Sequence, residues 1–334
     1  MSDLPTTMQA VACSAPNRFE IIERPVPQPR PDEILVETKA VGLCTSDISI
    51  ITGKMPDVTF PTERFGHEPS GIVRAVGSAV SRLAPGDRVT TLWARDGFMQ
   101  FADYYCVNER FAFALPAEVP FAHGLCEPLS AVLRSIGGAG LRTGDNVAVL
   151  GVGYFGLLMV QAARLLGAWR VVALDKSPRR LAIARELGAD AAYDVAEDGA
   201  ARALKEFTDG KGFDLVIECA GVQGAIDTAV DLVRPGGSVY VYAWHARPET
   251  VRPHTWLKGF KLLSNPACEG FDIARWHRLC EVGIEWLRRR LWRVDPLVTS
   301  ITAREGLMAA IEQLANRPDE VVKVVICPSA GPMV

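Results

Sequence analysis

Cys44 and His67 have the most distinctive chemistry in the first third of the chain. Cys44 stands in the run Gly-Leu-Cys-Thr-Ser-Asp that ends at Asp47, and His67 stands in Gly-His-Glu, so each has a carboxylate nearby. A thiolate and an imidazole are zinc-ligand chemistry, and Asp47 could orient an imidazole through a hydrogen bond. Each residue also has a plainer interpretation, because a single cysteine is often a small buried residue and a single histidine often packs in a core. The two residues alone leave a zinc site and a packing role both open.

The second chemical pattern is a glycine turn at residues 151–156. The apolar run 147–150 leads into Gly-Val-Gly-Tyr-Phe-Gly, a helical pattern follows as far as Gly167, and a second apolar run ends at Asp175. Strand, glycine turn, helix, strand and acid, in this order, are what a dinucleotide site requires. Three glycines alone would also fit a packing turn, but the flanking runs and the acid favour a nucleotide.

Each residue of the glycine turn has a distinct expected role. Gly151 makes the tight turn, Gly153 lets the backbone approach a pyrophosphate, and Gly156 lets the helix pack against the strand. The free N–H groups of the first helical turn, around Tyr154 and Phe155, are expected to face the phosphates. These five residues form the predicted phosphate-binding part of the site.

Asp175 and Arg180 are the expected contacts to the rest of the nucleotide. A carboxylate at Asp175 can accept both ribose hydroxyls, and it would repel the 2′-phosphate of NADP, so NAD is the predicted cofactor. Lys176 and Arg179 stand close enough in the sequence to weaken this preference. Arg180 either stacks on the adenine or is a solvated charge.

Alternating strand and helix patterns after residue 130 predict the elements that carry this site. They predict an α/β domain with an open parallel sheet, whereas the part before residue 130 is expected to form short strands and turns. The expected strands of the parallel sheet are 146–150, 170–174, 191–193, 213–218, 238–242 and 261–264. Trp244 and His245 follow the fifth strand at the edge where open sheets bind ligands, and neither is assigned a role.

Six motifs together resemble a known family, the zinc-dependent medium-chain dehydrogenases and reductases of the alcohol dehydrogenase superfamily. The motifs keep the family's order over nearly the whole chain: Gly-Leu-Cys-Thr-Ser-Asp (42–47), Gly-His-Glu (66–68), Pro-Gly-Asp-Arg-Val (85–89), Cys-Glu-Pro-Leu-Ser (126–130), the glycine turn (151–156) and Val-Val-Lys-Val-Val (321–325). The resemblance implies a Rossmann-type doubly wound parallel sheet, residues 129–265, inserted in a GroES-like β-barrel catalytic domain made of residues 1–128 and 266–334.

The resemblance also implies a catalytic zinc and roles for the residues around it. Cys44 and His67 match zinc ligands of the family, and Ser46 matches the hydroxyl that relays the substrate proton. The Glu-Pro-Leu run resembles the polyol and sugar dehydrogenase branch, in which its glutamate, here Glu127, faces the metal.

The third protein ligand has three candidates. Cys126 offers the softer ligand, but successive side chains of an extended segment point to opposite sides, so Cys126 and Glu127 are not both expected at one metal. The match to the polyol branch assigns the metal to Glu127, with Cys126 packed behind it. Glu68, next to His67, could replace Glu127 or exchange with it as substrate enters.

Two departures from the family pattern change these expectations. Members with a structural zinc carry four closely spaced cysteines after Gly-Asp-Arg-Val, whereas residues 90–98 contain none here, so one catalytic zinc and no structural zinc are expected. Many relatives have a histidine five residues after the first cysteine, where this chain has Ser49, so the exit path of the proton stays open. Trp93 and Phe98 flank a turn in the same stretch, and one of them is expected either in the core or in the substrate cleft.

Composition restricts the class of partner. The chain has 334 residues, 49% of them hydrophobic, with a net charge of -3 and no long basic run, which argues against nucleic acid or an anionic membrane. The apolar stretch 147–166 is long enough to cross a membrane, but its glycines fall at turn positions and Gln161 and Arg164 interrupt it. Eight cysteines without a Cys-x-x-Cys pair, together with a start that lacks a secretory signal pattern, predict a cytoplasmic protein.

The predicted function is that of a zinc- and NAD-dependent dehydrogenase, which interconverts a secondary alcohol, such as a polyol or sugar derivative, and its ketone. One alternative is a zinc-free NAD(P)H-dependent quinone or enoyl reductase on the same scaffold, although such relatives lack ligands like Cys44 and His67. Another is a non-catalytic nucleotide-binding protein, which an intact ligand set disfavours. Relatives pair through the edge of the nucleotide sheet, so the resemblance implies a homodimer or homotetramer.

Overall fold

The computed structural model describes residues 4–92, 100–197, 199–245, 248–264, 272–317 and 319–328, with only the backbone described at Pro253. The aromatic residues Trp93 and Phe98 lie outside the described residues. The chain forms two compact units, one made of residues 1–129, 280–290 and 294–334 and the other of residues 130–279 and 291–293. The predicted boundaries of the functional domains, with one domain made of residues 1–128 and 266–334 and the other of residues 129–265, stay a prediction.

The first unit is built from short, mostly antiparallel strands. Its strands are β1 (Thr7–Ala15), β2 (Arg18–Pro25), β3 (Glu33–Gly42), β4 (Pro69–Val76), β5 (Arg88–Thr91), β6 (Tyr104–Asn108), β7 (Ala112–Ala114), β14 (Val298–Ala303) and β15 (Lys323–Cys327). A seven-stranded sheet has the order β14-β15-β3-β4-β5-β7, with β6 also paired to β3, and β1 and β2 form a separate hairpin. The helices α1 (Thr45–Ile51) and α8 (Leu307–Asn316) belong to the same unit.

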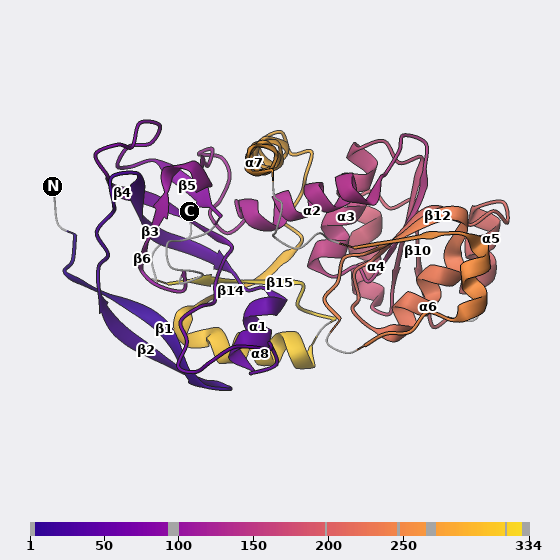
Figure 1. The fold of residues 1–334 in the computed structure, drawn as a ribbon, viewed down its shortest axis with the longest axis horizontal. Coiled ribbons are helices and arrows are strands. Elements are labelled where there is room, and N and C mark those ends of the chain that lie inside the picture. The colour runs from indigo at the N-terminus through magenta and orange to yellow at the C-terminus, as the bar shows by residue number, and fades with distance from the viewer. Residues whose placement is uncertain are drawn as a thin grey trace. The chain divides into compact units, whose positions relative to one another are not determined.

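The two ends of the chain meet in this sheet. Strand β15 pairs antiparallel with β3, where Val325 lies opposite Gly42, and β14 runs parallel to β15. Figure 1 shows these yellow C-terminal strands joined to strands of the indigo N-terminal part. The core beneath them gathers side chains from distant segments, among them Val41, Phe65 and Val324. The C-terminal strands β14 and β15 therefore extend the sheet that contains β3.

The second unit is a doubly wound α/β sheet. Its elements are β8 (Asn146–Leu150), α3 (Tyr154–Leu165), β9 (Arg170–Asp175), α4 (Pro178–Glu186), β10 (Ala191–Asp194), α5 (Ala200–Phe207), β11 (Phe213–Glu218), α6 (Gln223–Leu232), β12 (Val233–Val241), the short 3-10 helix η2 (Pro253–Lys258) and β13 (Lys261–Ser264). The six strands are all parallel and follow the order β10-β9-β8-β11-β12-β13. Two further helices, α2 (Cys126–Ala139) and α7 (Ile273–Arg288), each contribute residues to both units.

This strand order confirms the predicted fold class, since a doubly wound sheet places the first strand beside the fourth. The expected strands all form, and β12 begins five residues early, at Val233 rather than at residue 238. Its first residues, Val-Arg-Pro-Gly-Gly, have the composition of a turn, but Val233 pairs with Phe213 before the register shifts. Among the described residues, no helix is long and apolar enough to span a membrane.

Candidate metal and cofactor sites

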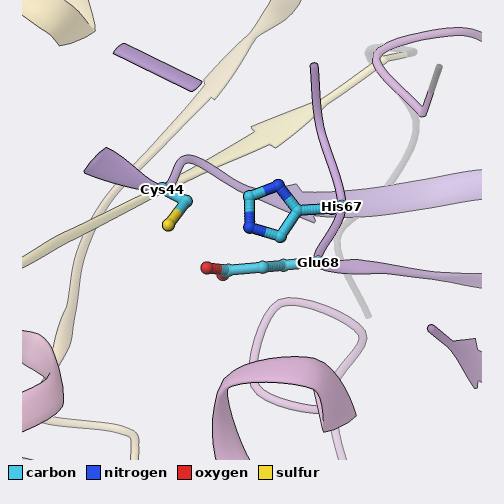
Figure 2. Close-up of side chains that lie close together, drawn as sticks. All are labelled: Cys44, His67 and Glu68. Carbon is cyan, nitrogen blue, oxygen red and sulfur yellow. The ribbon is translucent and has the colours of Figure 1, made fainter. Parts of the chain in front are cut away.

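Cys44, His67 and Glu68 form a cluster at one end of the β3–β4 pair. Cys44 directly precedes α1 after β3 has ended, and His67 and Glu68 directly precede β4. The N–H of Gly42 donates to the carbonyl of Glu68 at 2.9 Å, so the end of β3 lies against the start of β4. One ligand atom from each of the three side chains lies within 4.8 Å of the other two. Figure 2 shows the Cys44 sulfur, the His67 ring and the Glu68 carboxylate converging on one space.

Asp47 fixes two of the ligand-bearing segments from behind. Its side chain is fully buried, and its Oδ2 accepts a hydrogen bond from the N–H of Cys44 at 3.0 Å. Its Oδ1 accepts from the N–H of Gly66 at 2.7 Å and lies 3.2 Å from Nδ1 of His67. Because Nδ1 faces Asp47, Nε2 is the ring nitrogen that remains for the cluster. The predicted carboxylate–imidazole contact is therefore present.

The protonation states of Asp47 and His67 are coupled by this contact. Burial would raise the pKa of the Asp47 carboxyl, but the charge of His67 and hydrogen bonds from His67, Gly66 and Cys44 hold that pKa below its ordinary value. Burial would lower the pKa of His67, but Asp47 and Cys44 outweigh it and raise that pKa well above its ordinary value. Asp47 thus stays ionised behind an imidazole that holds its proton firmly in the metal-free protein.

Glu68 is a buried carboxylate with a single strong partner. It is 0% exposed, and within the described part of the chain neither carboxylate oxygen has a hydrogen-bond partner of good geometry. The Nζ of Lys323 lies 2.5 Å from Oε2, and Nζ also donates to the carbonyl of Leu43 at 3.1 Å. The ammonium compensates the buried charge, but the carboxylate oxygens keep lone pairs that a metal ion beside them can use. The donor set of thiolate, imidazole and carboxylate fits zinc.

Gly42 makes room for this arrangement. A Cβ at residue 42 would lie 2.1 Å from Oε2 of Glu68 and 2.9 Å from Cε of Lys323. Both distances are shorter than real Cβ contacts, so any larger residue would displace the ion pair. The glycine of the motif Gly-Leu-Cys is thus required first by Glu68 and then by Lys323, which comes from the far end of the sequence.

Glu127 and Cys126 lie at the start of α2 and do not belong to the group of three ligand atoms. Cys126 is fully buried, its N–H donates to Oγ1 of Thr90 at 3.0 Å, and burial followed by contact with Cys280 raises the pKa of its thiol well above the ordinary value. Glu127 is half-buried in the first turn of the helix. The structure brings Glu68 to Cys44 and His67, and the assignment of Glu127 to the metal stays a prediction.

Ser46 is half-buried in the first turn of α1, two residues after Cys44. Its part in proton transfer stays a prediction. Ser49, which stands where many relatives have a histidine, donates its hydroxyl to the carbonyl of Thr45 at 3.0 Å. That hydroxyl is thus engaged within its own helix.

The glycine turn of the second unit opens onto a cavity of about 590 Å³. Gly151 has a φ of +82°, and a Cβ there would lie 2.8 Å from the backbone nitrogen of Ala220. A Cβ at Gly156 would lie 2.1 Å from the carbonyl oxygen of Gly151, so the helix packs directly on the turn. Gly153 immediately precedes α3 and lines the cavity. The size of the cavity and its polar turn suit a nucleotide.

Asp175 links the glycine turn to the next turn of the sheet. Its Oδ2 accepts from the N–H of Val152 at 2.8 Å, and its Oδ1 accepts from Lys176 at 2.8 Å and from Ser177 at 3.0 Å. Asp175, Lys176 and Arg180 all line the cavity, so the predicted ribose acid and two cations border the same space.

Tyr154 and Phe155 begin α3 immediately after the glycine turn. Tyr154 is buried, and its ring meets that of Phe155 edge to face, with the ring centres 5.6 Å apart. Phe155 also contacts Tyr242, with ring centres 5.1 Å apart. Neither residue is among those that line the cavity, and their expected contact with the phosphates stays a prediction.

Lys323 is the site residue that sequence reasoning missed. It stands in Val-Val-Lys-Val-Val, where a lysine interrupts an otherwise apolar strand, and the side chain is only 4% exposed. The lysine is the first residue of β15, and a charged side chain at such a buried position is rare unless it is paired. That signal was present in the sequence, but the partner could not be read from it.

Two family models match parts of this chain. Residues 30–117 match "Alcohol dehydrogenase GroES-like domain", and residues 155–280 match "Zinc-binding dehydrogenase". The sorbitol dehydrogenase of sheep (Ovis aries) is 30% identical to this chain over 89% of its length and 90% of the relative's length.

Solved structures of dehydrogenases have the same fold as this chain. An oxidoreductase/dehydrogenase of unknown specificity from Escherichia coli superimposes with a TM-score of 0.87 at 26% identity, covering 96% of this chain and 99% of the other. A zinc-binding dehydrogenase from Sinorhizobium meliloti 1021, bound to NADP, superimposes with a TM-score of 0.81 at 26% identity, covering 97% of this chain and 100% of the other. The likeness extends over both units.

Proposed function

The chain belongs to the zinc-type medium-chain dehydrogenases, in their polyol dehydrogenase branch, and we propose that it transfers a hydride between a nicotinamide nucleotide and a secondary alcohol of the polyol class. The sheep relative is named for sorbitol, which is such an alcohol. A zinc-free reductase and a non-catalytic nucleotide-binding protein are both disfavoured, because a dehydrogenase relative matches 89% of the chain and three side chains that could hold a metal ion lie together.

The cluster of Cys44, His67 and Glu68 carries this proposal. Glu68 is a buried carboxylate whose oxygens have no hydrogen bond of good geometry within the described residues, and it lies beside a thiol and an imidazole that Asp47 orients. This arrangement has the chemistry of a zinc site with one position left for substrate. Cys44, His67 and Glu68 would hold the ion, with Glu127 as the alternative carboxylate.

Different residues of the chain have different proposed roles in the reaction. Zinc, when bound, supplies Lewis-acid polarisation of the substrate oxygen. Asp47 holds the His67 ring in one orientation, which keeps its Nε2 directed at the cluster. Ser46 is proposed to accept the proton of the substrate hydroxyl and pass it towards solvent. The glycine turn and the first N–H groups of α3 are proposed to hold the pyrophosphate of the nucleotide.

NAD is the proposed nucleotide. The Asp175 carboxylate lines the cavity and would face a 2′-phosphate of like charge, which is unfavourable. Lys176 and Arg180 line the same cavity and offset part of that repulsion. A preference for NAD, rather than an exclusion of NADP, is expected.

The direct test is a substrate screen with defined metal content. Purified protein is stripped of metal, reloaded with zinc, and assayed with NAD⁺ and NADP⁺ against polyols, simple secondary alcohols and sugars by the absorbance of reduced nicotinamide. Oxidation of polyols that appears only after zinc is restored supports the proposal. Reduction of quinones or enoyl substrates by the metal-free protein, without polyol oxidation by the zinc form, would contradict it.

We also propose that two copies of the chain pair along β13, as a homodimer or as half of a homotetramer. Among the described residues, β13 is one edge of the parallel sheet, and Leu262 on it is exposed. Trp256 and Leu257 of η2 are exposed nearby in the sequence, with Leu257 91% exposed. An uncovered edge strand beside large apolar side chains suits a second copy. Light scattering on the wild type and on Leu262→Glu tests it, and a monomeric wild type would contradict the pairing.

A cytoplasmic location is likewise a proposal. None of the seven cysteines in the described part of the chain forms a disulfide. Unpaired thiols in such number suit a reducing compartment.

A further inference from the structure

The chain that follows β12 lies against the turn between β11 and α6. The N–H groups of Tyr242 and Ala243 donate to the carbonyl of Glu218 at 2.9 and 3.2 Å. Gly221 has a φ of +71°, and a Cβ there would lie 2.9 Å from the carbonyl oxygen of Trp244. The backbones of the two segments are therefore in direct contact at these residues.

His245 adds a side-chain bridge between the same two segments. Its Nε2 lies 2.9 Å from Oε2 of Glu218, and its Nδ1 lies 3.2 Å from Oε1 of Glu249. We call these three residues, Glu218, His245 and Glu249, the histidine clasp. A neutral imidazole carries one N–H, so it can donate to only one of two carboxylates, whereas the imidazolium has two N–H donors. The clasp is complete only when His245 is protonated.

Glu218 connects the clasp to the wall of the nucleotide cavity. Its carboxylate is fully buried, and its Oε1 accepts hydrogen bonds from the N–H groups of Ala220 and Gly221 at 2.7 Å each. Cys219, Ala220 and Val222 from this turn all line the cavity. The carboxylate that holds His245 is thus the one that shapes the turn against the nucleotide.

The two carboxylates face opposite nitrogens of one ring, so they cannot share an ion, and the clasp is no metal site. Its two contacts hold one segment on another. We propose that His245 is a positioning residue, whose protonated ring holds the segment after β12 on the cavity wall and so makes nucleotide affinity fall as pH rises. The inference rests on the proposed nucleotide function of the cavity.

The charged groups that face His245 favour the protonated ring. Burial would lower the pKa of His245, but hydrogen bonds and charge from Glu218 and Glu249 outweigh it and raise that pKa above its ordinary value. Cys219, beside Glu218, stays protonated, because burial and the Glu218 charge raise the pKa of its thiol well above the ordinary value. The clasp is therefore complete below the ordinary histidine pKa of 6.5 and is lost as pH rises through the higher pKa of the folded protein.

The experiment measures nucleotide affinity against pH. NADH and NADPH are titrated into the zinc-loaded protein by nicotinamide fluorescence, from about pH 6 to about pH 9, which spans histidine titration. The wild type is expected to lose about tenfold in affinity over this range, within the usual span of coupling between two sites. His245→Gln is expected to bind weakly at every pH with a flattened profile. Glu249→Gln leaves one carboxylate, that of Glu218, beside the ring, so nucleotide affinity is expected to fall less steeply with pH than in the wild type.

His254→Gln is the matched control, because His254 is an exposed histidine of the same unit. It should keep the wild-type profile. A proton NMR titration of the ring, assigned by its loss in His245→Gln, should give a pKa above 6.5. If the nucleotide affinity of the wild type does not change with pH, or if His245→Gln shows the same pH dependence, the proposed role of His245 is wrong while nucleotide binding stands. Failure to bind either nucleotide at any pH overturns the proposed function as well.

Discussion

The ligand cluster of the first unit and the glycine turn of the second are both polar and at least partly buried, but they are assembled over very different lengths of chain. In the glycine turn, Asp175 binds the N–H of Val152, only 23 residues away. In the cluster, Lys323 binds the carbonyl of Leu43 across 280 residues and neutralises Glu68. A local site is specified by its motif, whereas a non-local one depends on which strands become neighbours.

The two sites also handle charge differently. Asp175 accepts hydrogen bonds from three backbone N–H groups, which satisfy both of its oxygens. Glu68 has the Lys323 ammonium instead, and neither of its oxygens has a hydrogen bond of good geometry within the described residues. A carboxylate in the second situation is available to a metal ion, whereas the first serves to shape a turn.

The largest expected effect comes from removing the distant cation. Lys323→Met leaves Glu68 as an uncompensated buried charge, so the free energy of unfolding of the metal-free protein should fall by about 3–5 kcal/mol. Zinc should restore part of this loss, because it supplies a second counter-charge. Chemical denaturation with and without zinc measures both quantities.

Lys39→Met is the matched control for that substitution. Lys39 also pairs with a glutamate, Glu37, at 2.5 Å, but its side chain is 28% exposed. A pair of this kind contributes less than about 1 kcal/mol. Equal losses in the two variants would show that the Lys323 pair is an ordinary salt bridge.

The next effect concerns the third metal ligand. Glu68→Gln should weaken zinc binding by more than about a hundredfold, since even loss of a partner that only orients a ligand costs about 10–100-fold. Glu127→Gln should retain zinc, because Glu127 lies outside the cluster. Competition with a chelating dye measures both affinities. If Glu127→Gln loses zinc and Glu68→Gln does not, then Glu127 is the third ligand, as the sequence predicted.

Ser46 is expected to act on the proton only. Ser46→Ala should lower turnover about a hundredfold, the usual contribution of a positioned proton acceptor. The affinity for reduced nucleotide should not change, because the glycine turn that is proposed to hold it lies elsewhere in the chain. Ser49→Ala is the control and should be nearly silent, since that hydroxyl is bonded to the Thr45 carbonyl. Steady-state rates at neutral pH decide between the two serines.

A smaller effect is expected in the glycine turn, where the motif is local and rigid. The added Cβ of Gly156→Ala would lie 2.1 Å from the Gly151 carbonyl oxygen, so overpacking should cost about 1–3 kcal/mol of stability and weaken nucleotide binding. Gly138→Ala is the control, because the nearest neighbour of its Cβ would be 3.8 Å away and an alanine favours a helix. Thermal unfolding of the two variants should shift in opposite directions.

The contrast between a local glycine turn and a non-local ligand cluster also explains which features the sequence could predict. The glycine turn and the strands of the parallel sheet were predictable, because each depends on periodicity and turn chemistry within a few dozen residues. Strand β12 begins earlier than predicted, since the pairing of Val233 with Phe213 overrides a turn-like composition. Within the cluster, Cys44 and His67 were predictable from their motifs.

The remaining features of the cluster needed the fold. Whether Glu68 or Glu127 lies at the ligand position depends on how β3, β4 and α2 pack, which no local pattern encodes. Lys323 was visible as a charge in an apolar strand, but its partner lies in the first third of the chain. The histidine clasp likewise joins Glu218 to a residue 27 positions later, after another helix and strand.

The smallest effect concerns the choice between NAD and NADP. The catalytic efficiency with NAD should exceed that with NADP, and Asp175→Asn should raise the relative efficiency with NADP by about tenfold, roughly the 1.4 kcal/mol of one screened charge contact. The effect is limited because Lys176 and Arg180 already line the cavity. Asp190→Asn is the control, since Asp190 also accepts a backbone hydrogen bond, from Val171 at 2.7 Å, but does not line the cavity. If both variants shift the ratio alike, charge at Asp175 does not select the nucleotide, and the acid serves only to hold the glycine turn.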